Sequence, residues 1–384
     1  MMRFPSELED IVIDFCHEHH STLASCGLVC RDWLPASRYH LFSSISLTFN
    51  NASSFIDILS VSQAIAPLVQ NVELRFSGAS LLHLEVISIL LLLPQTTRLS
   101  LLPARDEVTR PVCTSSLSGA LAALPLTHLK FDFESHFESL QQVIDCACLC
   151  PQLESLEVGG SWMKTGNFAV QRQLPKGLHT LILTCDLDNI LTWFLALEDR
   201  MPAIQHLSLH HIVMREVPTV IKYLETAGQT LRSLYLGFRD SMASGELGSH
   251  VDLTHSMSLR DVQLEGKRKA VFFGISALLP QLTLCGTERV TLTIQSQGTE
   301  GLYHNFLNLP SSYAWDTLDS GLSLLKRLTL VVIEPFTSFR SKNLLEDISK
   351  QLPLTCEKLR RVEEKSTMVF SGTHTIHTTL ILDN

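Results

Sequence analysis

The sequence predicts an α/β solenoid, in which short parallel strands alternate with helices, preceded by three short helices. Leucine is the most frequent of the 384 residues while aromatic residues reach only 7%, which favours a repetitive aliphatic interior. A repeat motif, apolar-x-x-apolar-x-apolar, recurs about every 27 residues along most of the chain. Helical patterns lie between the motifs, as at Val220, Ile221 and Leu224. Each repeat is therefore expected to be one strand and one helix.

Three helices are expected within the first 45 residues. Ser21 can cap the second helix, and Pro35 suits the opening turn of a third helix that ends at Phe42. So few residues bury too little surface to fold alone, so we expect a partner to cover part of it. The alternative is that the apolar face of the first helix packs wholly on the first repeat. That face carries Leu8, Ile11, Val12 and Phe15 at the spacing i, i+3, i+4 and i+7.

Each expected strand is marked by the central residue of the repeat motif. Because a single repeat cannot bury its own apolar face, stacked repeats must share one core, with strands on the concave side and helices on the convex side. The period is typical of leucine-rich repeats. The central residues are Ile45, Val72, Leu99, Leu129, Leu156, Leu181, Leu207, Leu234, Val262, Val290, Leu328 and Val362.

The motif degrades towards the C-terminus, where β-branched residues flank a turn at Ser371 and Gly372. This pattern predicts a hairpin that caps the last layer of the core. Two segments interrupt the period: a polar loop at 103–116 and a lengthened repeat at 295–323. The expected organisation is three helices in residues 1–45, an irregular leucine-rich-repeat solenoid in 46–365 and a capping hairpin in 366–384.

Charge and hydropathy restrict the partners and the compartment. The net charge is −9 and no run of Lys or Arg occurs, so we expect no nucleic-acid partner. The longest apolar run falls far short of the ~20 residues that span a bilayer, so we expect no membrane partner. The N-terminus turns acidic where a secretory signal would become apolar. We therefore expect a cytoplasmic or nuclear protein whose cysteines are free thiols.

No pattern in the sequence predicts catalysis, and we expect no catalytic residue, no metal and no cofactor. The run His17–His20 lacks the order of a zincin helix, and no phosphate loop or nucleophile elbow occurs. A hydrolase or metal enzyme stays the weakest alternative. It would have to use the thiols Cys146, Cys148 and Cys150 or the imidazoles His206, His210 and His211.

The N-terminal residues resemble a known family. Phe4–Asp14, reading Phe-Pro-Ser-Glu-Leu and then an apolar helix, resembles the opening of an F-box, which is normally Leu-Pro-x-Glu-Leu. Leu28–Trp33 resembles its second signature, and Leu34–Phe42 resembles the continuation common in fungal F-box proteins. The repeats lack the Asn or Cys that regular leucine-rich repeats carry after the strand, as Ile212 and Arg239 show. They are similar to the irregular leucine-rich repeats that often follow an F-box.

This resemblance implies a substrate-recognition subunit of a Skp-cullin-F-box ubiquitin ligase. The N-terminus would bind a Skp-type adaptor and, through it, a cullin, while the repeats would hold an unidentified target protein. The chain itself would perform no bond chemistry. The alternative is a leucine-rich-repeat scaffold that binds proteins outside ubiquitination. The resemblance implies these adaptor-contacting or supporting residues: Phe4, Pro5, Leu8, Ile11, Val12, Leu28, Val29 and Trp33.

Target-binding residues are expected on the concave side, where the side chains between the apolar positions of each strand point outwards. Their mixed charge predicts a polar protein surface or peptide as the ligand. The lengthened repeat adds aromatic residues, which are either interface anchors or rings packed against the solenoid edge. The candidates are Arg75, Lys130, Asp132, Glu157, His206, His210, Tyr235, Asp261, Glu265, Tyr303 and Trp315.

Overall fold

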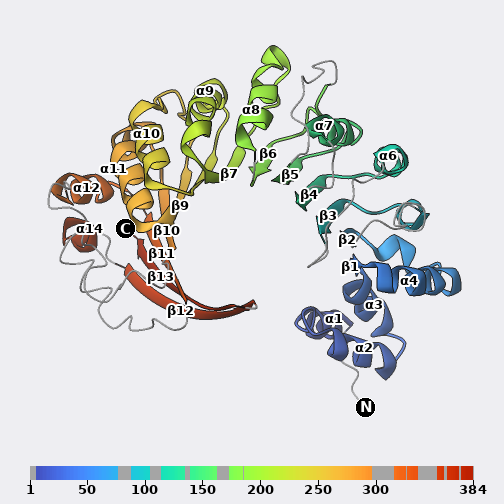
Figure 1. The fold of residues 1–384 in the computed structure, drawn as a ribbon. Coiled ribbons are helices and arrows are strands. Elements are labelled where there is room, and N and C mark those ends of the chain that lie inside the picture. The colour runs from blue at the N-terminus through green and yellow to red at the C-terminus, as the bar shows by residue number, and fades with distance from the viewer. Residues whose placement is uncertain are drawn as a thin grey trace. The chain divides into compact units, whose positions relative to one another are not determined.

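The fold is that of a computed structural model, which describes residues 6–76, 88–103, 114–134, 139–161, 173–184, 186–295, 315–325, 327–335, 353–358, 361–371 and 373–383. Two compact units make up the chain, Met1–Leu178 and His179–Asn384. In each unit parallel strands form one layer and helices cover its outer face, which leaves the inner face open (Figure 1). The predicted fold class, short helices followed by an α/β solenoid, is therefore confirmed.

The first unit opens with the N-terminal module, which consists of α1 (Ser6–Asp14), α2 (His20–Val29) and α3 (Leu34–Phe42). Pro35 lies in the first turn of α3, as expected for a residue whose fixed φ suits a helix start. The predicted cap at Ser21 is wrong. The carbonyl of His19 already accepts the helical hydrogen bond from the N–H of Leu23 at 3.0 Å, so α2 begins ahead of Ser21.

The repeats of the first unit follow α3, which contacts the first strand. Each strand up to β5 pairs in parallel with the next. The elements are β1 (Ser44–Leu47), α4 (Phe49–Val61), the 3₁₀ helix η1 (Ala66–Leu68), β2 (Asn71–Phe76), β3 (Arg98–Pro103), α6 (Thr114–Ala123), β4 (His128–Glu134), α7 (Leu140–Cys148) and β5 (Ser155–Ser161).

The second unit continues the same alternation through β11. Its elements are β6 (Thr180–Leu183), α8 (Leu187–Leu195), η2 (Glu198–Arg200), β7 (His206–Ile212), η3 (Met214–Glu216), α9 (Val217–Ala227), β8 (Ser233–Phe238), α10 (Ser241–His250), β9 (Asp261–Lys267), α11 (Arg268–Cys285), β10 (Arg289–Gln295), α12 (Trp315–Leu322), β11 (Arg327–Pro335), α14 (Pro353–Lys358), β12 (Arg361–Ser371) and β13 (Thr373–Asp383).

The strand register follows the repeat motif residue by residue. In the first unit Ile45 pairs with Val72, and the pairing continues through Leu99 and Leu129 to Leu156. In the second unit the central residues from Leu181 to Leu328 pair in the same way. A slip by one residue would turn the whole apolar set of a strand to the open face, so burial specifies this register.

A repeated hydrogen bond also joins the repeats. The carbonyl of Gln70, which lies just ahead of β2, accepts the N–H groups of Thr97 at 2.9 Å and Arg98 at 3.0 Å. The carbonyls of Ser43, Thr97, Thr127, His179, Gln205, Arg232 and Arg260 each accept two N–H groups from the next repeat in the same way. These bonds satisfy the backbone groups of the turn before each strand, where no ladder bond is available.

Each motif contributes its three apolar positions to the core, and the helices contribute further buried side chains such as Phe194 and Tyr223. In the third repeat Leu99 and Leu101 are buried, and the first position is Thr96, which is also buried. Thr287 occupies the same position ahead of β10. The hydroxyls of both threonines lack a hydrogen-bond partner, so these two layers are less stable than leucine would make them.

Capping residues explain where two helices of the second unit begin and end. The carboxylate of Asp240 accepts the N–H of Ala243 at 2.8 Å and so caps the N-terminus of α10. Helix α11 ends at Cys285, and the next residue, Gly286, caps it with a φ of 72°, in the left-handed region that glycine tolerates.

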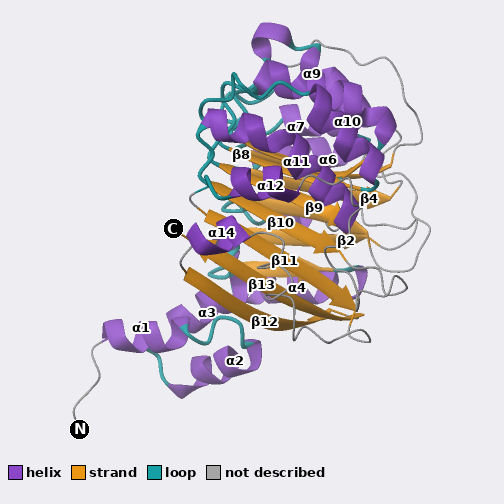
Figure 2. Cartoon of the chain, turned by 90° about the vertical axis from the view of Figure 1, so that its left-hand side faces the viewer, coloured by secondary structure: helices purple, strands orange, loops and turns teal. Residues whose placement is uncertain are grey.

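The C-terminal strands differ from the repeats. β13 pairs antiparallel with both β11 and β12, and therefore lies between them (Figure 2). Val362 was expected to mark another repeat strand, and this prediction is wrong because Val362 lies in β12, opposite Leu382 of β13. Strand β12 starts at Arg361 rather than Ser366, so the hairpin includes residues assigned to the solenoid. Gly372 of the expected turn lies outside the described residues.

Candidate binding surfaces

The N-terminal module exposes a large apolar surface. Among the predicted adaptor contacts, Phe4 and Pro5 lie outside the described residues, and Trp33 is half-buried at the start of α3. The exposed fractions are 45% for Leu8, 48% for Ile11, 53% for Val12, 80% for Phe15, 89% for Leu28 and 64% for Val29.

The interior of the module uses other side chains. Ile13 and Leu23 are fully buried, and Cys26 is nearly so. A hydrogen bond of 2.7 Å between the His40 imidazole and the Asp14 carboxylate links α3 to the end of α1. The predicted apolar face of the first helix therefore points to solvent. The alternative in which it packs wholly on the first repeat is wrong, because Ile13 alone turns inward from α1 among the described side chains.

In the first unit, the predicted target residues lie on the open face of β2, β4 and β5. The Lys130 ammonium and the Glu157 carboxylate, which are neighbours in register, are 2.7 Å apart. Arg75 forms an ion pair of 2.6 Å with Glu73 of its own strand. Asp132 is exposed. The two cations thus already have acidic partners on the same face, which lowers their availability to a ligand.

In the second unit, His206 and Asp261 lie at the start of β7 and β9. The His206 ring meets the His179 ring edge to face, with centroids 6.2 Å apart. Desolvation, and then the charges of His179 and Arg232, lower the pKa of His206 below its ordinary value. Asp261 forms an ion pair of 3.4 Å with Arg289 on the next strand. The Asp261 carboxylate at this end of the strands therefore already has a basic partner.

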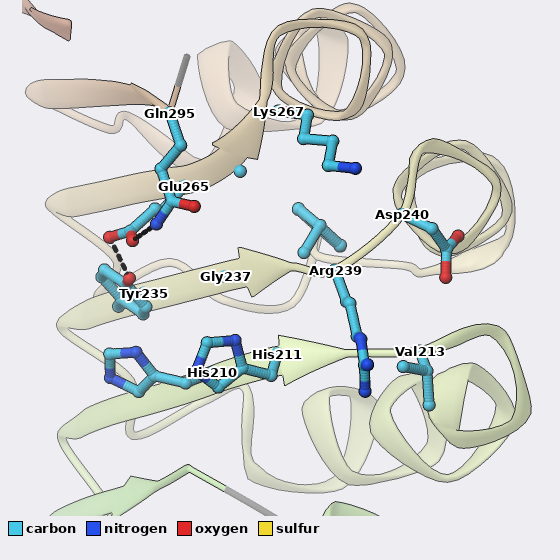
Figure 3. A pocket seen from close by; sticks show the side chains of 12 residues that line it. His210, His211, Val213, Tyr235, Gly237, Arg239, Asp240, Glu265, Lys267 and Gln295 are labelled. Atoms are coloured by element: carbon cyan, nitrogen blue, oxygen red, sulfur yellow. Dashed lines mark hydrogen bonds between the residues drawn. The ribbon is translucent and has the colours of Figure 1, made fainter. Parts of the chain in front are cut away.

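The other end of the same strands forms a hollow, where three of the predicted target residues meet. His210, Tyr235 and Glu265 come from β7, β8 and β9 and line a volume of ≈ 550 Å³ (Figure 3). The Tyr235 hydroxyl donates to the Glu265 carboxylate, and the Gln295 amide donates to the same carboxylate at 2.6 Å. The His210 and Tyr235 rings lie 4.3 Å apart at an angle of 34°. Burial, followed by Glu265, raises the pKa of Tyr235, so its hydroxyl stays protonated.

The shape of the hollow depends on two local features. The register of β7 shifts between Leu209 and Ile212, so the extra residue His211 adopts a φ of 58° and both histidines of the bulge border the hollow. Gly237 forms part of the wall between them and Glu265 (Figure 3). A Cβ at Gly237 would lie 3.2 Å from the Tyr235 ring, so glycine leaves this wall as bare backbone.

Sequence reasoning did not assign five polar residues of this hollow to target binding: His211, Arg239, Asp240, Lys267 and Gln295. Each lies at or just beyond the end of its strand, outside the repeat motif. Arg239 was noted only as a departure from the usual Asn or Cys. The common signal was a polar residue at the strand end in successive repeats, since parallel strands bring such residues to one edge.

The aromatic candidates of the lengthened repeat stay predictions. Tyr303 lies outside the described residues, and so does most of the segment 295–323. Trp315 is the first residue of α12, and its side chain is not among those described.

The thiols and imidazoles considered for metal binding lie on separate elements, the thiols on and just after α7 and the imidazoles on β7. Among the described residues, no group of three or more His, Cys, Asp or Glu is arranged to hold a metal ion. Cys146 and Cys150 are buried at the end of α7, and burial raises the pKa of the Cys150 thiol to about 12. In the run 17–20, the first three residues lie between α1 and α2, whereas His20 is the first residue of α2.

Within the described part of the chain, no helix is both long enough and apolar enough to cross a membrane. Comparison of the chain with protein-family models and with curated proteins gives no match.

Proposed function

We propose that this chain is the substrate-recognition subunit of a Skp-cullin-F-box-type ubiquitin ligase. The N-terminal module binds a Skp-type adaptor, and the open face of the repeats holds a target protein. The observation that carries the proposal is the exposure of large apolar side chains on α1 and at the end of α2, above all Leu28 at 89%. These are the residues that the resemblance to the F-box assigns to the adaptor.

The physical argument is the cost of leaving this surface in water. Fully burying one Leu or Ile side chain contributes about 1.5–3 kcal/mol, and soluble monomers rarely expose contiguous apolar patches of more than a few hundred Å². The module has few buried side chains of its own, with Ile13 and Leu23 at its centre. A partner that covers the exposed residues would stabilise the module as well as bind it.

The chain has no bond chemistry to perform in this function. Its contribution is effective concentration, because a target on the repeats and an adaptor on the module are held by one molecule. Substrate recognition by such a subunit takes place in the cytoplasm or the nucleus. We take the chain to need neither a metal nor a cofactor.

Co-purification of the full chain with a Skp-type adaptor and a cullin tests the proposal. We expect both proteins to co-purify with the wild-type chain, and the double variant Leu28→Asp, Val29→Asp to lose both at an unchanged melting temperature. The matched control is Val61→Asp, which alters a side chain that is 88% exposed on α4, outside the module. Adaptor without cullin would favour the scaffold outside ubiquitination. Full adaptor binding by the double variant would contradict the proposed surface.

A further inference from the structure

The acidic side chains of the hollow in the second unit are already engaged. The carboxylate of Glu265 accepts hydrogen bonds from the Tyr235 hydroxyl and, at 2.6 Å, from the Gln295 amide. The carboxylate of Asp240 accepts the N–H of Ala243 at the start of α10. Both acids therefore have donors within the protein, and neither needs a ligand to satisfy it.

The basic side chains of the hollow contrast with these acids. Arg239 and Lys267 are exposed, and within the described residues neither side chain forms an ion pair or a hydrogen bond. The same holds for the imidazole of His211 in the described part of the chain. Figure 3 shows Arg239 and Lys267 projecting from the ends of neighbouring strands in different directions, with His211 on the same side as Arg239. The chain as a whole carries a net charge of −9, so basic side chains that have no ion pair within the described residues are notable here.

We infer that the hollow binds an anionic side chain within an extended segment of the target protein. The inference rests on the proposed function in taking the ligand to be a target segment. Arg239 can bind a carboxylate or a phosphate through two parallel N–H groups, and Lys267 and His211 add charge-assisted donors. A phosphorylated residue and a run of Asp or Glu present the same chemistry to these donors.

The remaining walls suit a peptide. The His210 and Tyr235 rings stack beside the anion site, with centroids 4.3 Å apart and planes tilted by 34°, and Gly237 lets a backbone approach closely. Small-molecule sites are lined predominantly by apolar side chains, whereas this hollow is mostly polar and opens on the exposed face of the strands. Its volume of ≈ 550 Å³ accommodates a few side chains and not a folded domain.

Fluorescence anisotropy with the purified full chain tests the inference. The probes are three pools of short labelled peptides with the same randomised flanks and a central phosphoserine, glutamate or glutamine. We expect the phosphoserine pool, the glutamate pool or both to bind about tenfold more tightly than the glutamine pool, and the bound pool identifies the source of the charge. We expect the double variant Arg239→Glu, Lys267→Glu to lose this preference.

The matched control is Arg215→Glu, Lys222→Glu, which reverses the same two charges on exposed side chains of η3 and α9. It should leave binding within about twofold of wild type. If the charge reversal lowers the melting temperature, Arg239→Gln, Lys267→Gln replaces it. Equal binding of the three pools, no binding of any pool, or equal losses in variant and control would overturn the inference. Adaptor co-purification is measured on every sample, so failure of the proposed function is seen separately from failure of the hollow.

Discussion

Replacing Leu28 by alanine should weaken adaptor binding more than any other single truncation in the N-terminal module. Leu28 is 89% exposed, so nearly its whole side chain is available for burial by a partner. Losing that burial costs about 2 kcal/mol, which corresponds to about 30-fold in the dissociation constant. Leu8 is 45% exposed, so Leu8→Ala should cost about half as much, or about fivefold.

Titration calorimetry of the full chain against the purified adaptor measures these losses, and thermal denaturation follows the stability. Leu28→Ala should leave the melting temperature unchanged, whereas Leu23→Ala, at 0% exposure, should destabilise the fold by about 2–5 kcal/mol. Val61→Ala, at 88% exposure on α4, controls for loss of an exposed apolar group elsewhere. The reasoning would be refuted if Leu28→Ala bound the adaptor like wild type, or if Val61→Ala lost as much affinity.

Three further predictions follow from the packing and the titrating groups. Gly248→Ala should destabilise the fold by about 1–3 kcal/mol in urea denaturation, because its Cβ would lie 2.6 Å from that of Ala277. Gly245→Ala on the same helix meets nothing within 4 Å and should stabilise the fold by about 0.5–1 kcal/mol. Similar effects of the two variants would contradict the close packing of α10 on α11. Because the pKa of His206 is lowered in the fold, the unfolded chain binds a proton at this residue first as the pH falls below about 6.5. The melting temperature of the wild type should therefore decrease slightly in this range, and that of His206→Gln should decrease less. Identical pH profiles would show that His206 does not contribute. Iodoacetamide should modify the exposed Cys30 in the native protein, as detected by peptide mass mapping. It should modify the buried Cys150, whose pKa is raised to about 12, only after denaturation. Early modification of Cys150 would show that this layer of the core opens.

The repeat motif alone determined the strands and their register. The last two apolar positions of the motif are two residues apart on the strand and can both be buried in only one register, so Leu99, Leu129 and Leu156 had to lie side by side once the repeats stacked. The same logic failed at Val362. There the apolar pattern was compatible with a strand in either direction, and the antiparallel pairing of β12 with β13 depends on the turn that joins them.

The tertiary structure decided which faces stay free. Helical periodicity placed Leu8 and Ile11 on one face but could not say whether that face turns inward, because a helix of nine residues has apolar side chains on more than one side. Ile13 packs inward instead, and the predicted face remains exposed.

The hollow in the second unit also required the tertiary structure. Arg239, Lys267 and Gln295 are separated by about one repeat each in the sequence, and only the stacking of parallel strands brings their ends together. The left-handed backbone of His211, where the register of β7 shifts, leaves no clear mark in the sequence, since most histidines have negative φ and nothing in the repeat motif singles this one out. Buried leucines recur at fixed spacing and can therefore be recognised in the sequence, whereas a binding surface consists of side chains that core packing does not constrain.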